Sequence, residues 1–278
     1  MSLLDLTARN GDAPPLEGKG FFTDTSICIG CKACEVACKQ WNQLPMDDLT
    51  WLGSSYDNTH HLSGTTWRHV TFAEQPGSGG AGGQTTWLMM SDVCKHCAHA
   101  GCLEACPTGA IIRTEFNTVV IQQNICNGCS YCVTNCPYGV ITVNTVAANG
   151  PAGDGKAHKC TLCYDRLKDG LEPACAKSCP TDAIQFGDVR ELRERATRRV
   201  TDLRARGLDA HFYGDENLGA TNGIGHLNAS FLLLDEPRKY NLPEAPHLPQ
   251  DRTLPGVLAM AATAVVFTLT TALSLRRG

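Results

Sequence analysis

Cysteine is the residue type in this sequence whose number and spacing could do chemistry. The chain of 278 residues contains 16 cysteines, and all of them fall into four short groups. The groups are Cys28, Cys31, Cys34 and Cys38; Cys94, Cys97, Cys102 and Cys106; Cys126, Cys129, Cys132 and Cys136; and Cys160, Cys163, Cys175 and Cys179. In such spacing three thiolates on a tight loop can bind three irons of one cubane, while the fourth cysteine points away and ligates another cluster.

An internal repeat extends beyond the cysteines themselves. In three groups a proline follows the fourth cysteine, and the sequences 107–111 (PTGAI), 137–141 (PYGVI) and 180–184 (PTDAI) resemble one another. Proline prevents a regular element from continuing through this point. Repetition of this kind indicates a repeated structural unit.

Two other uses of cysteine have to be weighed against iron-sulfur ligation. A disulfide framework is typical of small secreted chains, and cysteines three positions apart suit bridging poorly. Structural zinc usually takes two well-separated pairs of ligands, which the compact runs of four do not provide. The spacing therefore favours four [4Fe-4S] clusters, with all sixteen cysteines as ligands.

The pairing of the groups is predicted from their order in the chain. The second and third groups are adjacent, separated by a strand-like stretch at 118–121, so we expect them to exchange their fourth cysteines, and the first group must then pair with the fourth. The predicted ligand sets are set 1, Cys28, Cys31, Cys34 and Cys179; set 2, Cys94, Cys97, Cys102 and Cys136; set 3, Cys126, Cys129, Cys132 and Cys106; and set 4, Cys160, Cys163, Cys175 and Cys38.

Several basic side chains lie inside or beside the cysteine loops. They are Lys32, Lys95, His96 and Lys159. Positive charge near a cluster favours its reduced form. The alternative is that these residues are solvated, as loop residues generally are.

The remaining elements would position the clusters. Alternating patterns predict two strands at 65–72 and 84–90, joined by a glycine-rich loop at 77–83. Apolar residues recur at helical spacing in 188–207, among seven arginines that form either a solvated face or a docking surface. A proline-rich stretch at 236–249 predicts an extended linker.

Composition and the chain ends narrow the function further. A net charge of −4 and a pI near 6.1 lack the basic excess of nucleic-acid-binding proteins. Residues 1–20 carry charges and no apolar run, so we expect no secretory signal there. Residues 254–275 contain no charge and are followed by Arg276 and Arg277, which predicts one C-terminal transmembrane helix, with a helix buried against a partner as the alternative.

Three stretches carry a resemblance to a known family. They are residues 28–42 (CIGCKACEVACKQWN), 55–59 (SYDNT) with 67–70 (WRHV), and 160–167 (CTLCYDRL). Nearly the whole chain resembles the iron-sulfur (beta) subunits of complex molybdenum or tungsten oxidoreductases, and it is most similar to the formate dehydrogenase beta subunit. Some relatives replace one cysteine of the third group, whereas this sequence keeps Cys129 and its neighbours.

The expected fold is α+β, with two pseudo-symmetric bacterial-type double-[4Fe-4S] ferredoxin units, a β-hairpin insertion and the transmembrane helix. The expected domains are an N-terminal extension (1–20), a four-cluster ferredoxin-like domain (21–187, with the insertion at 41–90 and an inner unit at 91–150), an amphipathic helix and linker (188–253), and the membrane helix (254–275).

The resemblance implies an electron-transfer subunit that is no enzyme by itself. It implies a catalytic alpha subunit with a molybdenum or tungsten bis-pterin, and a membrane cytochrome b or other quinone-reducing gamma subunit. Alternatives are the equivalent subunit of a hydrogenase or of a polysulfide or sulfoxide reductase, and a soluble polyferredoxin carrier. Arg276 and Arg277 would keep the C-terminus cytoplasmic and leave the cluster domain on the outer face of the membrane; a cytoplasm-facing domain is the alternative.

Overall fold

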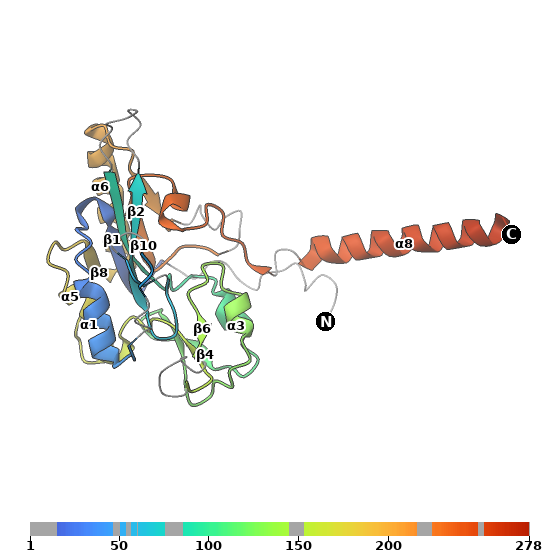
Figure 1. Cartoon of the computed structure of the whole chain (residues 1–278), viewed down its shortest axis with the longest axis horizontal. Helices are drawn as coiled ribbons and strands as arrows, with labels where there is room; N and C mark the ends of the chain where they lie inside the picture. The colour runs from blue at the N-terminus through green and yellow to red at the C-terminus, as the bar shows by residue number, and fades with distance from the viewer. Residues whose placement is uncertain are drawn as a thin grey trace.

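The protein combines short helices with small sheets, as predicted for the α+β class (Figure 1). The computed structural model describes residues 16–46, 51–53, 57–59, 61–75, 86–144, 153–215, 224–249 and 253–277. The strands are β1 (Lys19–Asp24), β2 (Arg68–Gln75), β3 (Thr86–Val93), β4 (Ile111–Arg113), β5 (Val119–Ile121), β6 (Thr142–Val143), β7 (Ala157–His158), β8 (Ile184–Asp188), β9 (His211–Tyr213) and β10 (Ala229–Leu233). The helices are η2 (Thr25–Ile27), α1 (Ala33–Asn42), α2 (Gly101–Glu104), α3 (Tyr131–Thr134), α4 (Tyr164–Lys168), α5 (Ala174–Lys177), α6 (Val189–Ala205), η3 (Pro237–Tyr240) and α8 (Thr253–Arg277).

The largest sheet has the strand order β8-β1-β10-β9. Strand β1 pairs antiparallel with β8 and parallel with β10, so segments from both ends of the cluster region meet in it. Successive side chains of a strand point to opposite faces, and the neighbours Phe21 and Phe22 accordingly enter two different cores. The segment that follows residue 188 thus supplies β9 and β10 to the same sheet as the cysteine-bearing region.

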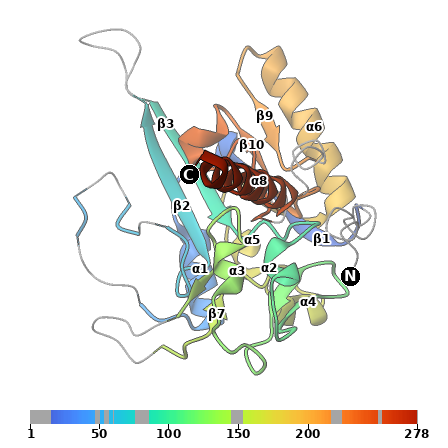
Figure 2. The same cartoon turned by 90° about the vertical axis from the view of Figure 1, so that its right-hand side faces the viewer.

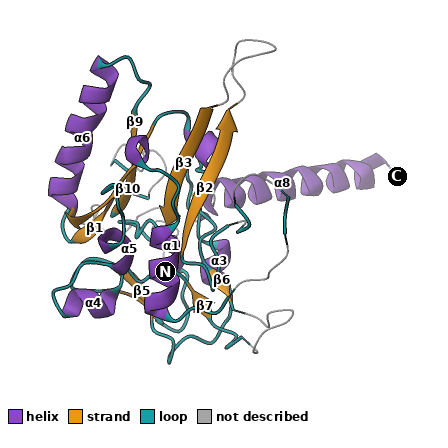
Figure 3. Ribbon diagram, turned by 60° about the vertical axis from the view of Figure 1, so that its left-hand side comes forward, coloured by secondary structure: helices purple, strands orange, loops and turns teal. Residues whose placement is uncertain are grey.

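Helix α6 covers one face of this sheet (Figure 3). Its buried residues are Val189, Leu192, Ala196, Val200 and Leu203, the apolar positions whose helical spacing predicted the element. They pack with Phe22 and Leu232. Arg199 is not part of a solvated face. Its Nε lies 2.9 Å from Asp24 Oδ2 at the end of β1 and forms an ion pair with it.

The β2–β3 hairpin packs on the opposite side of the sheet, and the far ends of its strands stand clear of the other elements (Figure 2). Both strands start two or three residues later than predicted and run to Gln75 and Val93. Val70 and Met90 from the hairpin share the larger core with Phe21. The predicted glycine-rich loop at 77–83 lies outside the described residues.

Short helices carry five of the sixteen cysteines, and the other eleven lie in the loops that join the small elements. Strand β4 pairs with β5, and β6 pairs with β7, each pair antiparallel. Helix α1 packs against α5, and α2 packs against α3. These four helices hold or directly precede the fourth cysteine of each group.

The proline-rich segment differs from the predicted extended linker. It contains η3, and Tyr240, Leu242 and Leu248 are buried in the larger core. Burial of apolar side chains holds the segment on the protein surface instead of leaving it as a free spacer.

Helix α8 extends away from the body (Figures 1 and 3). Its residues Gly256–Arg276 are long and apolar enough to cross a membrane, with a mean hydropathy of 1.9, and none of that stretch is buried within the protein.

Candidate iron-sulfur sites

The cysteine loops share one backbone feature. The residue directly before the second cysteine of each group has a positive φ: Gly30 (64°), His96 (45°), Gly128 (73°) and Leu162 (58°). This left-handed conformation costs side-chain-bearing residues energy and is rare outside turns. Its recurrence shows that all four loops turn in the same way. The sequence does not reveal this, because only two of the four positions are glycine.

A second repeated turn follows the fourth cysteine in three groups. The N–H groups of Gly109, Gly139 and Asp182 donate to the carbonyl oxygens of the cysteines three residues earlier, at 3.2 to 3.3 Å. All three of these residues also have a positive φ. The repeated Cys-Pro-x-Gly/Asp sequence is therefore a repeated structural turn, as the internal repeat predicted.

Three cavities are each lined by the four cysteines of one predicted set. Set 1 lines a cavity of about 300 Å³, set 2 one of about 330 Å³ and set 3 one of about 290 Å³. Apolar side chains such as Ile184, Val140 and Ile121 complete the three walls. Polar residues also line each cavity, among them Asn127, Lys95 and Ser91. Four thiols around such a cavity fit a cubane, which takes four thiolates. Within the described ranges no three His, Cys, Asp or Glu side chains converge closely enough to hold a single metal ion.

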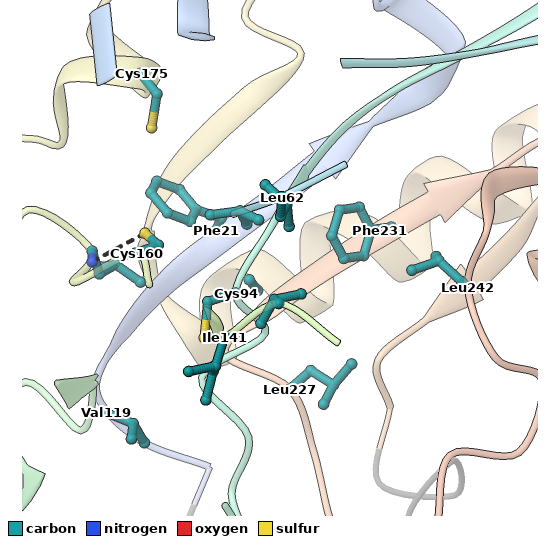
Figure 4. Close-up of a cluster of buried hydrophobic side chains, with 14 of the residues drawn as sticks. Phe21, Leu62, Cys94, Val119, Ile141, Cys160, Cys175, Leu227, Phe231 and Leu242 are labelled. Atoms are coloured by element: carbon teal, nitrogen blue, oxygen red, sulfur yellow. Dashed lines mark hydrogen bonds between the residues drawn. The ribbon is translucent and has the colours of Figure 1, made fainter. Parts of the chain in front are cut away.

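The cysteines of set 4 also lie together, all of them buried. Burial and the neighbouring thiolates of Cys160, Cys175 and Cys163 raise the pKa of Cys38 well above its usual value. Figure 4 shows Cys160 and Cys175 among apolar core residues, with the Leu162 N–H donating to the Cys160 sulfur at 3.3 Å. The structure thus gathers the cysteines of sets 1, 2 and 3 around three cavities, and it buries those of set 4 near one another.

The cavities disfavour free thiolates. Burial raises the pKa of Cys34 to about 11 and that of Cys102 to about 12. Burial and the neighbouring thiolates of its set likewise raise the pKa of Cys132 to about 11. Four thiolates could share such a cavity only with a positively charged centre between them, as iron would provide.

Three of the four basic residues singled out in the loops are buried instead of solvated. Lys95, His96 and Lys159 are each at most 2% exposed. The Lys159 Nζ donates to the carbonyl oxygen of Cys160 at 3.1 Å, and the thiolates of Cys94 and Cys102 outweigh burial and raise its pKa. The expectation of a positive charge is wrong for His96, because burial and the nearby Lys159 hold its pKa well below the usual value and leave the ring neutral.

Arg68 is a candidate functional residue that the sequence did not predict. The stretch that contains it, 67–70, was noted only as part of the family resemblance. Arg68, the first residue of β2, is 1% exposed and lies over the Phe21 ring at 4.7 Å. The thiolates of Cys175, Cys34, Cys160 and Cys38 overcome the effect of burial and raise its pKa. Its position in a strand between two distant cysteine groups gave no sequence signal.

Comparisons with known proteins agree with this geometry. Residues 27–110 match one family described as a 4Fe-4S dicluster domain, and residues 85–189 match a second family of the same description. The two matches together cover all sixteen cysteines.

Similar proteins are iron-sulfur subunits. The nitrate-inducible formate dehydrogenase iron-sulfur subunit of Escherichia coli (strain K12) is 38% identical over 88% of this chain and 81% of its own length. The formate dehydrogenase-O iron-sulfur subunit of the same organism is 37% identical over 87% and 78% of the two chains. The formate dehydrogenase iron-sulfur subunit of Haemophilus influenzae is 38% identical over 83% and 70%. This chain therefore belongs to the family of formate dehydrogenase iron-sulfur subunits, and its dicluster domains and sixteen cysteines provide for four [4Fe-4S] clusters.

Proposed function

We propose that the chain conducts electrons through four clusters, from a catalytic subunit that oxidises formate at a molybdenum or tungsten bis-pterin to a membrane cytochrome b or other quinone-reducing subunit. The observation that carries this proposal is that twelve thiols line three cavities in fours, while the four thiols of set 4 lie near one another. The bound clusters supply one-electron redox chemistry, and the protein supplies their positions and surroundings.

We assign sets 1 to 4 as the ligands of the four clusters. The shared lining of three cavities supports the assignment for sets 1, 2 and 3, and the mutual influence of Cys38, Cys160, Cys163 and Cys175 supports it for set 4. The equivalent left-handed positions support two double-cluster ferredoxin units, an inner one within 91–150 and an outer one across 21–187. On this basis residues 41–90 are an insertion that carries the hairpin.

The sets follow the order 1, 4, 2, 3. Set 1 adjoins set 4, because α1 packs on α5 and Arg68 lies near cysteines of both. Set 4 adjoins set 2, because the Cys94 thiolate adds to burial in raising the pKa of Cys160. Set 2 adjoins set 3, because α2 packs on α3 and Cys132 influences the pKa of Cys102.

The two ends of this series reach the surface. Cys31 of set 1 and Cys129 of set 3 are exposed, whereas all of set 4 is buried. Exposed apolar side chains stand beside both ends, Ile29 and Val36 near set 1 and Tyr131 near set 3. Partners that exchange electrons with the chain would therefore dock at set 1 and at set 3.

Set 3 is the end that we assign to the membrane side. Leu248, which precedes α8, packs closely on Gly101 of α2, beside the carbonyl group of Asn135 at the end of α3, so the segment before α8 lies against the inner unit formed by sets 2 and 3. Helix α3 faces the same side of the body as α8 (Figure 1). Set 1 would then receive electrons from the catalytic subunit.

We propose that α8 anchors the chain as a single transmembrane helix. Arg276 and Arg277 at its end favour a cytoplasmic C-terminus, with the cluster region on the outer face after export together with a partner. If the cluster region faced the cytoplasm, the proposed orientation would be wrong, but the proposed electron-transfer role would not be affected.

The test is purification of the membrane complex under anaerobic conditions, followed by an assay of quinone reduction with formate. We expect formate-dependent activity and about sixteen irons in this chain, four for each cubane. Inactivity with formate but activity with hydrogen or polysulfide would overturn the substrate, and far less iron would overturn the cluster assignment.

A further inference from the structure

We propose that Arg68 sets the reduction potentials of the two clusters of the outer unit, raising those at set 1 and set 4, and that it acts on set 1 through Ser91. This inference rests on the cluster assignment proposed above. It concerns a residue that binds no cluster itself.

Arg68 is a buried charge whose partners are thiols. Among the residues that the structure describes, no carboxylate forms an ion pair with its guanidinium group, and its Nε and Nη2 atoms have no hydrogen-bond partner. A buried cation is costly unless it is paired, and arginine keeps its charge at every physiological pH. The nearby negative groups are the sulfurs of Cys175, Cys34 and Cys160, so the charge is compensated by the cluster environment.

Ser91 connects the guanidinium to one ligand. The Arg68 Nη1 donates to Ser91 Oγ at 2.9 Å and to the Ser91 carbonyl oxygen at 3.3 Å. Ser91 Oγ lies 3.2 Å from the Cys34 sulfur. Because arginine can only donate, the serine hydroxyl accepts from Arg68 and keeps its own proton for the Cys34 sulfur.

Both effects stabilise a reduced cluster. Reduction adds one electron and one negative charge without forming or breaking a bond, so a fixed positive charge nearby favours it. Hydrogen bonds to cluster sulfurs act in the same direction. The guanidinium lies near cysteines of sets 1 and 4, and the serine contacts set 1 alone.

Lys159 occupies the corresponding place at the next junction. Its pKa is raised by the thiolates of Cys94 and Cys102 of set 2 and Cys160 of set 4, which outweigh burial. Set 2 therefore has a cation of its own beside it. Because no cysteine of set 2 or set 3 is among the thiolates that act on Arg68, Arg68 should leave those two clusters almost unaffected.

The experiment is an EPR-monitored redox titration of the full chain, purified anaerobically in detergent with the subunits that accompany it. Arg68→Met should make reduction of two clusters at least tenfold less favourable, about 59 mV for a one-electron couple, and leave the other two in place. Arg68→Lys should recover most of the shift, because the charge returns. Ser91→Ala should lower the potential of one of the same two clusters.

Arg198→Met is the matched control, since Arg198 is 69% exposed on α6 and pairs only weakly with Glu194. It should move no potential. Unchanged potentials in Arg68→Met with full iron content would overturn the proposal, as would equal shifts of all four clusters. If Arg68→Met loses its clusters, Ser91→Ala becomes the deciding variant. Four unshifted potentials in Ser91→Ala would also overturn the proposal. Lack of formate activity in the unmodified complex would refute the proposed function separately, since the potentials are measured without substrate.

Discussion

Among single residues, the left-handed glycines differ in what surrounds them. Gly128 precedes the second cysteine of its group, and a Cβ there would lie 2.0 Å from the carbonyl oxygen of Gly155. Gly139 follows the fourth cysteine of the same group, and a Cβ there would meet open space. Both glycines have a positive φ, so alanine at either position strains the backbone, but only alanine at Gly128 would also clash with a neighbouring group.

Gly128→Ala should displace the loop of set 3 and lower the iron content from about sixteen to about twelve per chain, the loss of one cubane. Gly139→Ala should cost about 1–2 kcal/mol of left-handed strain and keep all of the iron. Iron and sulfide analysis of anaerobic preparations measures both. Equal iron in the two variants would show that the loop can move away from Gly155.

The exchange of fourth cysteines makes a prediction about Cys38, which stands in the first group but is assigned to set 4. Cys38→Ser should alter the same EPR signal as Cys160→Ser and spare the signal altered by Cys28→Ser. Cys31→Ser is the matched control, because it removes a cysteine that stays with its own group. A shared defect of Cys38→Ser and Cys28→Ser would mean that the first group keeps all four of its ligands.

At the level of elements, α6 shows why some of the fold could be predicted. The helical spacing of its apolar residues can be recognised from the local sequence alone, and that spacing predicts which positions are buried. Strands β9 and β10 have no such local signature, since β10 is a fully buried run that inserts beside β1 from about 200 residues away. Its apolar sequence Ala229–Leu233 was the available signal.

Leu192→Ala should destabilise the folded chain by about 2–5 kcal/mol, because the buried Leu192 packs α6 onto the sheet and a cavity would remain. Arg198→Ala, on the exposed face of the same helix, should change stability by less than about 0.5 kcal/mol. Cluster proteins generally unfold irreversibly, so the measurement is the anaerobic unfolding rate in guanidinium chloride, followed by circular dichroism. Similar rates for the two variants would argue that α6 contributes little to holding the sheet.

The site was predictable to the extent that cysteine spacing determines it. The repeated groups predicted which thiols line the three cavities, because three cysteines on a tight loop can share one cubane while the fourth points to another. The buried cations were not predictable, since Arg68 and Lys159 are stabilised by thiolates distant in sequence. The same reason explains the proline-rich segment, whose Tyr240, Leu242 and Leu248 find their apolar partners only in the folded molecule.

On the scale of the whole molecule, the cluster-bearing body and α8 are distinct parts. Every cysteine lies in the body, and the apolar stretch of α8 contributes nothing to the buried core. Removal of residues 253–278 should therefore leave a chain, produced by itself, that needs no detergent and retains about sixteen irons. Removal of residues 276–278 alone should keep the chain in the membrane fraction. Sedimentation and iron analysis test this, and a shortened chain that stays in the membrane would assign the anchor to the body.

The unequal exposure of the cysteines has a consequence for handling the isolated subunit in air. Oxygen attacks accessible sulfur and iron first, and Cys31 and Cys129 are exposed while the four cysteines of set 4 are buried. During brief aeration we expect the terminal clusters to decay first, and the innermost one to outlast them, as absorbance and Mössbauer spectra would record. Docked partners would cover both vulnerable ends, so assembly should lengthen the aerobic lifetime of the subunit.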